Sequence, residues 1–168
     1  MYLYLVRHAV AHKRDPERWP DDNRRPLTPE GEEEFVGAAR GLAHVVPEVE
    51  VLLSSPYERA WRTAEILAEQ TGWLAPEKLP ALEPDVLPEK VVIALKTYAE
   101  KQSIALVGHR PSLHELAVYL LTGEAGGADM KIKKGGVACI EFDDAPKVGA
   151  GKLRWLFTPK VLRNLAVS

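Results

Sequence analysis

Short apolar runs alternate with longer amphipathic segments along this chain. The runs are rich in aliphatic and β-branched residues, as is typical of strands, and lie at 2–6, 49–53, 103–107, 136–142 and 152–158. Apolar residues recur with helical spacing at 29–46, 56–71, 88–101 and 111–122. The polar stretch 8–27 and the proline-rich stretch 74–87 are expected to be connections, the second with a short strand near Leu79–Leu82.

Three of the predicted helices begin at motifs that cap free backbone N–H groups. The sequence TPE at 28–30 combines a threonine cap, a proline at the first helical position and an acid in the first turn. SPYE at 55–58 and SLHE at 112–115 have the spacing of a capping box. Pro47 and Gly72 are expected to end the first two helices.

This order of elements predicts an α/β fold. Strands that alternate with helices form a largely parallel sheet between two helical layers, a three-layer α/β/α architecture. The last two strands, joined by Pro and Gly, are expected to add an antiparallel C-terminal hairpin. With 168 residues and no internal repeat, the chain is expected to be a single domain over 1–168.

Arginine and histidine follow the predicted strands, where a solvated turn would more naturally carry Gly, Asn, Asp or Ser. Arg7 and His8 come directly after the first strand, Arg59 lies just beyond the second, and His109 follows a later buried strand. Ligands bind beyond the carboxyl ends of parallel strands, so these four side chains are expected at one crevice.

Such a set suits phosphoryl chemistry. Arginine stays charged and binds phosphate oxygens through a bidentate fork. A histidine among arginines resists protonation, because like charges repel, and its neutral imidazole is a nucleophile. The residues therefore predict phosphoryl transfer to a histidine, followed by attack of water on the phosphohistidine.

Four ordered blocks resemble those of the histidine phosphatase superfamily, also called phosphoglycerate-mutase-like. They are LVRHAVAH, RRPLTPEG, SSPYERAWRTAE and LVGHRPSL, and they span residues 3 to about 115. RRPLTPEG is similar to a stretch of the short SixA-type phosphohistidine phosphatase branch. In the third block Arg62 stands where the family usually has Gln.

The resemblance implies a role for each matched residue. His8 would be the phosphorylated nucleophile, and His109 would hydrogen-bond the phosphoryl oxygens. Arg7 and Arg59 would bind the phosphoryl group, with Arg25 as a further pocket arginine. The leading substrate is phosphohistidine on a protein, and a sugar phosphate or nucleotide is the alternative. A phosphate- or phosphoprotein-binding module without turnover is a third possibility from another class.

A general acid cannot be assigned from the sequence. Family members that cleave esters use a carboxylic acid to protonate the leaving group. Glu83, Asp85 and Glu89 are all candidates. A phosphoramidate needs such an acid less, because its imidazole leaves as a neutral group once protonated. Residues 74–102 leave no room for a large lid, so an open site is expected.

The composition narrows the range of binding partners and cofactors to expect. Net charge is −2, from 22 basic and 24 acidic residues, which argues against nucleic acid as a partner. Cys139 is the single cysteine, so there is no internal disulfide framework or metal cluster, and we expect no metal and no cofactor. No basic leader or long apolar run is present, so we expect a cytoplasmic protein with no membrane partner.

Overall fold

A six-stranded sheet forms the centre of the molecule in the computed structural model, which describes residues 1–167. The strands, in the spatial order β3-β2-β4-β1-β5-β6, are β1 (Tyr2–Arg7), β2 (Val51–Ser54), β3 (Glu77–Lys78), β4 (Ser103–Gly108), β5 (Val137–Glu141) and β6 (Lys152–Phe157). The first four are parallel, whereas β5 runs antiparallel to β1 and β6 antiparallel to β5. The predicted mostly parallel sheet with an antiparallel C-terminal hairpin is therefore confirmed.

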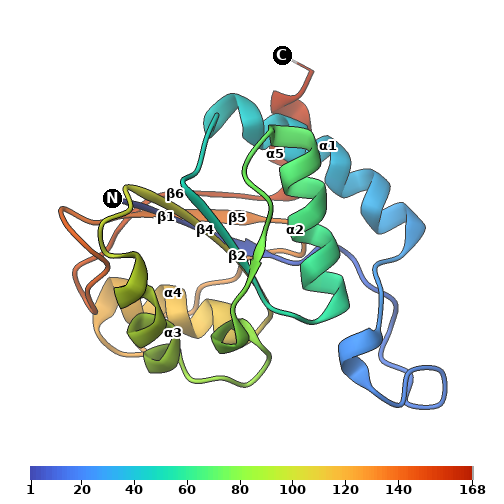
Figure 1. The fold of residues 1–168 in the computed structure, drawn as a ribbon, viewed down its shortest axis with the longest axis horizontal. Helices are drawn as coiled ribbons and strands as arrows, with labels where there is room; N and C mark the ends of the chain where they lie inside the picture. The colour runs from blue at the N-terminus through green and yellow to red at the C-terminus, as the bar shows by residue number, and fades with distance from the viewer. Residues whose placement is uncertain (168) are drawn as a thin grey trace.

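Helices cover both faces of the sheet (Figure 1). One layer contains α1 (Pro29–Val45), α2 (Glu58–Thr71) and α5 (Pro159–Leu165), and the other contains α3 (Pro88–Leu95) and α4 (Ser112–Thr122). Short 3₁₀ turns complete the chain: η1 (Asp22–Arg24), η2 (Pro80–Leu82) and η3 (Lys96–Tyr98). This arrangement confirms the predicted three-layer architecture.

Strand β1 shows how the sequence divides the core between the two layers. Tyr4 and Val6 pack into the cluster under α1 and α2, whereas Leu3 and Leu5 pack into the cluster under α3 and α4. Successive side chains of a strand point to opposite faces, so a strand covered on both sides must be apolar throughout. This burial explains why the apolar run of β1 does not alternate with polar residues.

The first predicted cap is confirmed and the two capping boxes are wrong. The Thr28 hydroxyl accepts a hydrogen bond from the Gly31 N–H at 2.9 Å, at the start of α1. Helices α2 and α4 begin after Tyr57 and Pro111, and neither has a side-chain cap. The Ser112 hydroxyl instead accepts from the backbone N–H of Asp85 at 3.0 Å.

Two further predictions need correction. The short strand lies at Glu77–Lys78, not near Leu79–Leu82, where Pro80 lacks an N–H for pairing and the chain makes a 3₁₀ turn. The expected helix over 88–101 ends as an α-helix at Leu95 and continues as 3₁₀. Helix α5 had no counterpart among the predicted elements.

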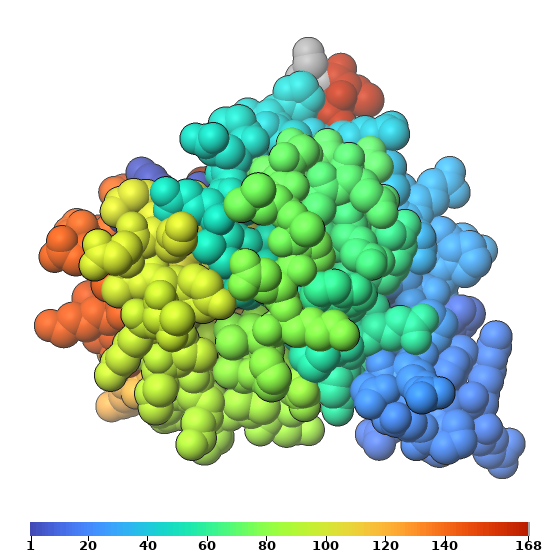
Figure 2. All heavy atoms as spheres, viewed as in Figure 1, coloured from blue at the N-terminus to red at the C-terminus, as the bar shows by residue number. Residues whose placement is uncertain are grey.

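The segment between β1 and α1 projects from the body of the molecule as a separate lobe, blue in Figure 2. A bridge between Ala11 and Leu27 closes its base, and the His12 N–H donates to the Pro26 carbonyl at 3.1 Å. The His12 ring packs on Trp19, with ring centroids 5.1 Å apart. The two ends of the lobe therefore meet at Ala11 and Leu27, a few residues beyond the end of β1. No helix within residues 1–167 is long and apolar enough to cross a membrane.

Candidate active site

Backbone pairing brings three segments together at the carboxyl edge of the sheet. Strand β4 lies between β2 and β1, and Arg7 is in register with Gly108. The His8 N–H donates to the Gly108 carbonyl at 3.1 Å, and the Ser55 N–H donates to the Val107 carbonyl at 3.0 Å. His8, Ser55 and His109 consequently leave the sheet side by side, at the predicted crevice.

His8 is buried, with 7% of its surface exposed, and one ring nitrogen is already bonded. Its Nδ1 lies 2.7 Å from the Ala9 carbonyl oxygen. A carbonyl only accepts, so Nδ1 carries the proton and Nε2 of the neutral ring keeps a free lone pair. The Ala9 N–H donates to the Thr63 hydroxyl on α2 at 3.0 Å, which fixes the turn after His8.

The surroundings keep the His8 imidazole neutral. Burial is the main cause that lowers its pKa to about 3, and the positive charges of Arg59, Arg7 and Lys134 lower it further. The bond to Ala9 acts in the opposite direction but is outweighed. At neutral pH this ring therefore has its Nε2 lone pair available.

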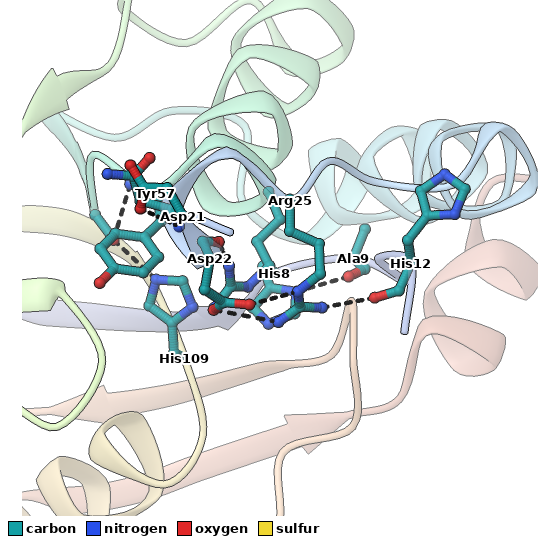
Figure 3. Close-up of polar contacts among 11 residues, drawn as sticks. His8, Ala9, His12, Asp21, Asp22, Arg25, Tyr57 and His109 are labelled. Atoms are coloured by element: carbon teal, nitrogen blue, oxygen red, sulfur yellow. Dashed lines mark hydrogen bonds and ion pairs between the residues drawn. The ribbon is translucent and has the colours of Figure 1, made fainter. Parts of the chain in front are cut away.

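His109 lies beside His8, with ring centroids 5.2 Å apart (Figure 3). Its Nε2 is 2.8 Å from the Ser55 hydroxyl, and the Tyr57 ring packs against it edge-on at 5.3 Å. Burial, followed by the neighbouring His8, lowers its pKa to about 2, so this ring is neutral as well. The Ser55 hydroxyl thus contacts the site, and it also accepts from the Tyr57 N–H at 3.3 Å in the turn before α2 begins at Glu58.

The three predicted arginines reach the same place from different elements. The Arg7 Nη1 donates to the Ile132 carbonyl at 3.0 Å. On α2, Arg59 is 4% exposed and donates to Asp22, from Nη1 to the carbonyl at 2.9 Å and from Nη2 to the carboxylate at 3.1 Å. Arg25 donates from Nε to the same carboxylate at 2.8 Å. Asp22 therefore connects Arg59 and Arg25.

Three buried nitrogens of this cluster have no hydrogen-bond partner among residues 1–167: Nε of Arg7, Nε of Arg59 and Nδ1 of His109. Buried polar groups in proteins are nearly always bonded, so three such groups at one site indicate a function. Guanidinium N–H groups beside a neutral histidine suit an oxyanion. The arrangement can bind a phosphoryl group and present a nucleophile to it.

Several contributors at the site were missed by sequence reasoning. Asp22 precedes Arg24 and Arg25 in the lobe, and Lys134 lies in the loop before β5. Thr63 follows Arg59 by one helical turn, and its hydroxyl donates to the Arg59 carbonyl at 2.7 Å. The i, i+4 spacing on α2 was the one available signal, because Asp22 lies in the short turn η1 of the lobe and Lys134 in a loop, and neither segment has a sequence period.

The three candidate general acids differ in how far they are buried. Glu83 is half-buried after η2, and its charge raises the pKa of Tyr57, second to burial. Asp85 and Glu89 are exposed.

Arg62 has ion pairs with three carboxylates of α1 and α2: Glu32, Glu65 and Glu69. No group of three or more metal-ligating side chains occurs in residues 1–167.

The sequence model of the histidine phosphatase superfamily (branch 1) matches residues 3–83, which include Arg7, His8, Arg25 and Arg59. The structure of the protein histidine phosphatase SixA complexed with tungstate has the same fold, with a TM-score of 0.82 and 26% identity over 96% of this chain and 99% of that chain. The chain belongs to the histidine phosphatase superfamily.

Two more proteins are similar to this histidine phosphatase over most of its length. The putative phosphohistidine phosphatase SixA from Agrobacterium tumefaciens shares the fold, with a TM-score of 0.76 and 22% identity over 94% of this chain and 97% of that chain. An uncharacterised protein of Picosynechococcus sp. is 33% identical over 139 residues, 82% of each chain. His109 lies beyond the matched residues 3–83, yet the fold places it against His8.

Proposed function

We propose that this histidine phosphatase hydrolyses phosphohistidine on a protein, through a phosphoryl group held transiently on Nε2 of His8. The observation that supports this most is the hydrogen bond between His8 Nδ1 and the Ala9 carbonyl. It leaves Nε2 unprotonated in a neutral ring surrounded by arginines. Covalent catalysis divides the hydrolysis into two transfers at phosphorus.

In the first transfer the Nε2 lone pair of His8 attacks phosphorus. A new N–P bond forms while the N–P bond of the substrate breaks, and its electron pair stays on the substrate imidazole, which takes a proton from water. In the second transfer a water molecule attacks phosphorus and gives its proton to solvent, and the bonding pair returns to Nε2. Arg7, Arg59 and Arg25 stabilise the charge on the phosphoryl oxygens in both transfers.

The choice of phosphohistidine rests on two further observations. The similar structure of SixA is that of a protein histidine phosphatase, and it was determined with tungstate, an oxyanion. Between β3 and β4 this chain has only α3 and short 3₁₀ turns, so this segment forms no large lid between the site and a macromolecular substrate. A phosphohistidine on a protein surface could then enter directly.

Labelling tests the covalent step. The enzyme is mixed with a ³²P-phosphohistidine peptide and stopped within one turnover in alkaline denaturant, because phosphohistidine is labile to acid. We expect label on His8, no label on His8→Ala, and wild-type labelling of His44→Ala, whose histidine is exposed on α1. Turnover by wild type without label on His8 would rule out the proposed intermediate, and absence of turnover with any phosphorylated substrate would favour a binding module.

Hydrolysis of a small phosphate ester is the second candidate, and the position of Glu83 favours it. Glu83 is close enough to Tyr57 to raise its pKa, and Tyr57 packs on His109. A carboxylic acid there would protonate an alkoxide leaving group. If esters are the substrate, Glu83→Gln should lower kcat on sugar phosphates and nucleotides and spare phosphohistidine, and wild-type kcat/KM should be higher on the esters.

A further inference from the structure

A groove of about 460 Å³ opens directly beside Arg7, between α1, α5 and the loop before β5. Four more cations line it: Lys133, Lys134, Lys160 and Arg163. Glu34 is the one acidic side chain in its lining. The whole chain has a net charge of −2, so this concentration of positive charge is local.

The cations of this basic groove are largely unpaired. Lys133, Lys134 and Lys160 are exposed and make no ion pair with any residue in 1–167. Arg163 approaches Glu34 only to 3.7 Å, and its buried Nη1 has no hydrogen-bond partner in the same residues. Arg62, by contrast, pairs with three carboxylates elsewhere on the surface.

The groove is joined rigidly to the active site. The Gly135 N–H donates to the carbonyls of Arg7 and His8 at 3.0 and 3.1 Å, which ties the loop of Lys133 and Lys134 to the end of β1. Partial burial of its ammonium group lowers the pKa of Lys134, and the charge of Arg7 lowers it further because the two cations repel each other. An anion bound between them would relieve this repulsion.

Helix α1 is shaped to hold the far end of the groove. A Cβ added at Gly37 would lie 3.2 Å from Cγ of Arg163, so the glycine leaves space for the arginine stem to cross α1. The guanidinium is thereby held at the groove. The row of charges extends from the phosphoryl site to α5, further than a single phosphoryl group requires.

His8 is 7% exposed, so a phosphohistidine side chain reaches it only when the surface of its carrier protein covers the surrounding rim. On the side of Arg7 this rim is the basic groove. We propose that the basic groove docks an acidic surface of the phosphorylated carrier protein while its phosphohistidine lies in the active site. This inference rests on the proposed function, and charge complementarity of this kind sets partner choice and association rate.

Two phosphohistidine peptides of equal length test the docking. One has Asp and Glu around the phosphohistidine, and the other has Asn and Gln at the same positions. Free phosphohistidine is the third substrate. The variant Lys133→Ala/Lys160→Ala removes two groove charges without changing a residue of the catalytic cluster, and Lys90→Ala/Lys96→Ala, exposed on and just after α3, removes the same charge elsewhere.

We expect the groove variant to lose about tenfold in kcat/KM on the acidic peptide at low salt, and the difference to close in roughly 0.5 M salt. Its activity on the neutral peptide and on free phosphohistidine should equal wild type, as should the activity of the α3 variant on all three. An equal loss on both peptides, or no loss, would overturn the docking proposal. If wild type hydrolyses none of the three substrates, the proposed function itself fails, and the docking proposal with it.

Discussion

Asp22 places a carboxylate where two guanidinium groups of the site meet. Arg59 and Arg25 both donate to it, and the backbone carbonyl of Asp22 accepts a further bond from Arg59. Burial alone would raise the pKa of Asp22, but the hydrogen bond from Arg25 and the charge of Arg59 hold it below its usual value. The carboxylate is thus ionised, and it accepts hydrogen bonds from the two guanidinium groups that would also donate to a phosphoryl group.

Removal of this charge should strengthen phosphate binding. Asp22→Asn keeps the backbone carbonyl that positions Arg59 but removes a negative charge that repels a phosphate dianion. We expect the inhibition constant of inorganic phosphate to fall about fivefold, as for one charge at a partly exposed site worth roughly 1 kcal/mol. The inhibition constant is measured by titrating inorganic phosphate into the hydrolysis of a phosphohistidine peptide.

Asp21→Asn is the matched control. Its carboxylate accepts from the Asn23 N–H and makes no bond to an arginine of the site, so its loss should leave phosphate inhibition near wild type. Weaker phosphate binding in Asp22→Asn would show that the carboxylate mainly orients the two guanidinium groups.

Residues at strand ends could be predicted from the sequence, whereas this carboxylate could not. Arg7, His8 and His109 follow apolar runs directly, and the rule for parallel sheets places all three at one edge. Asp22 lies in a lobe whose path depends on tertiary contacts, such as the Arg25 bond to the His12 carbonyl at 2.6 Å. No periodic pattern encodes that path.

Among the elements, α5 shows where pattern reading failed. It begins with a Thr-Pro pair like that of α1, and the Thr158 hydroxyl accepts from the Val161 N–H at 3.3 Å. Its seven residues are too few to show a convincing period. The strands and longer helices were predictable because burial on one or both faces imposes a repeat. The helix is instead specified by its fit against α1.

Gly41 is the position of closest approach between these two helices. A Cβ added there would lie only 1.7 Å from the Leu162 carbonyl oxygen, and Leu162 is fully buried. Gly41→Ala should therefore force α5 away from α1. We expect the free energy of unfolding to fall by about 3 kcal/mol, the cost of overpacking at a rigid contact. Urea denaturation followed by circular dichroism measures this change.

Gly37→Ala provides the comparison on the same helix. Its Cβ would meet the flexible stem of Arg163 at 3.2 Å, which can shift where a backbone cannot. We expect a loss of less than about 1 kcal/mol, since a side chain adjusts more easily than a helix. Equal losses for the two variants would show that α5 is not held at Gly41.

On the scale of the whole molecule, the site makes folding sensitive to acid. His8 and His109 are both buried and neutral, with pKa values of about 3 and about 2, so the folded chain does not protonate them at pH 5. In the unfolded chain a histidine has a pKa of about 6.5 and does take up a proton. The unfolded state then binds more protons, so stability rises with pH below 6.5 and falls as the solution is acidified.

From pH 7 to pH 5 the free energy of unfolding should fall by about 2 kcal/mol for each of the two histidines. The reason is that pH 5 lies about 1.5 units below the unfolded pKa of about 6.5, and each unit is worth roughly 1.4 kcal/mol. The value does not depend on the folded pKa so long as this stays below about 4. His8→Asn retains an amide N–H that can donate to the Ala9 carbonyl but removes the proton uptake. Urea denaturation at both pH values should show a loss about 2 kcal/mol smaller in His8→Asn than in wild type, and about 4 kcal/mol smaller in the double variant with His109→Gln. The same loss in all three proteins would mean that the two rings are protonated in the folded state, and the neutral nucleophile assigned to His8 would fail with them.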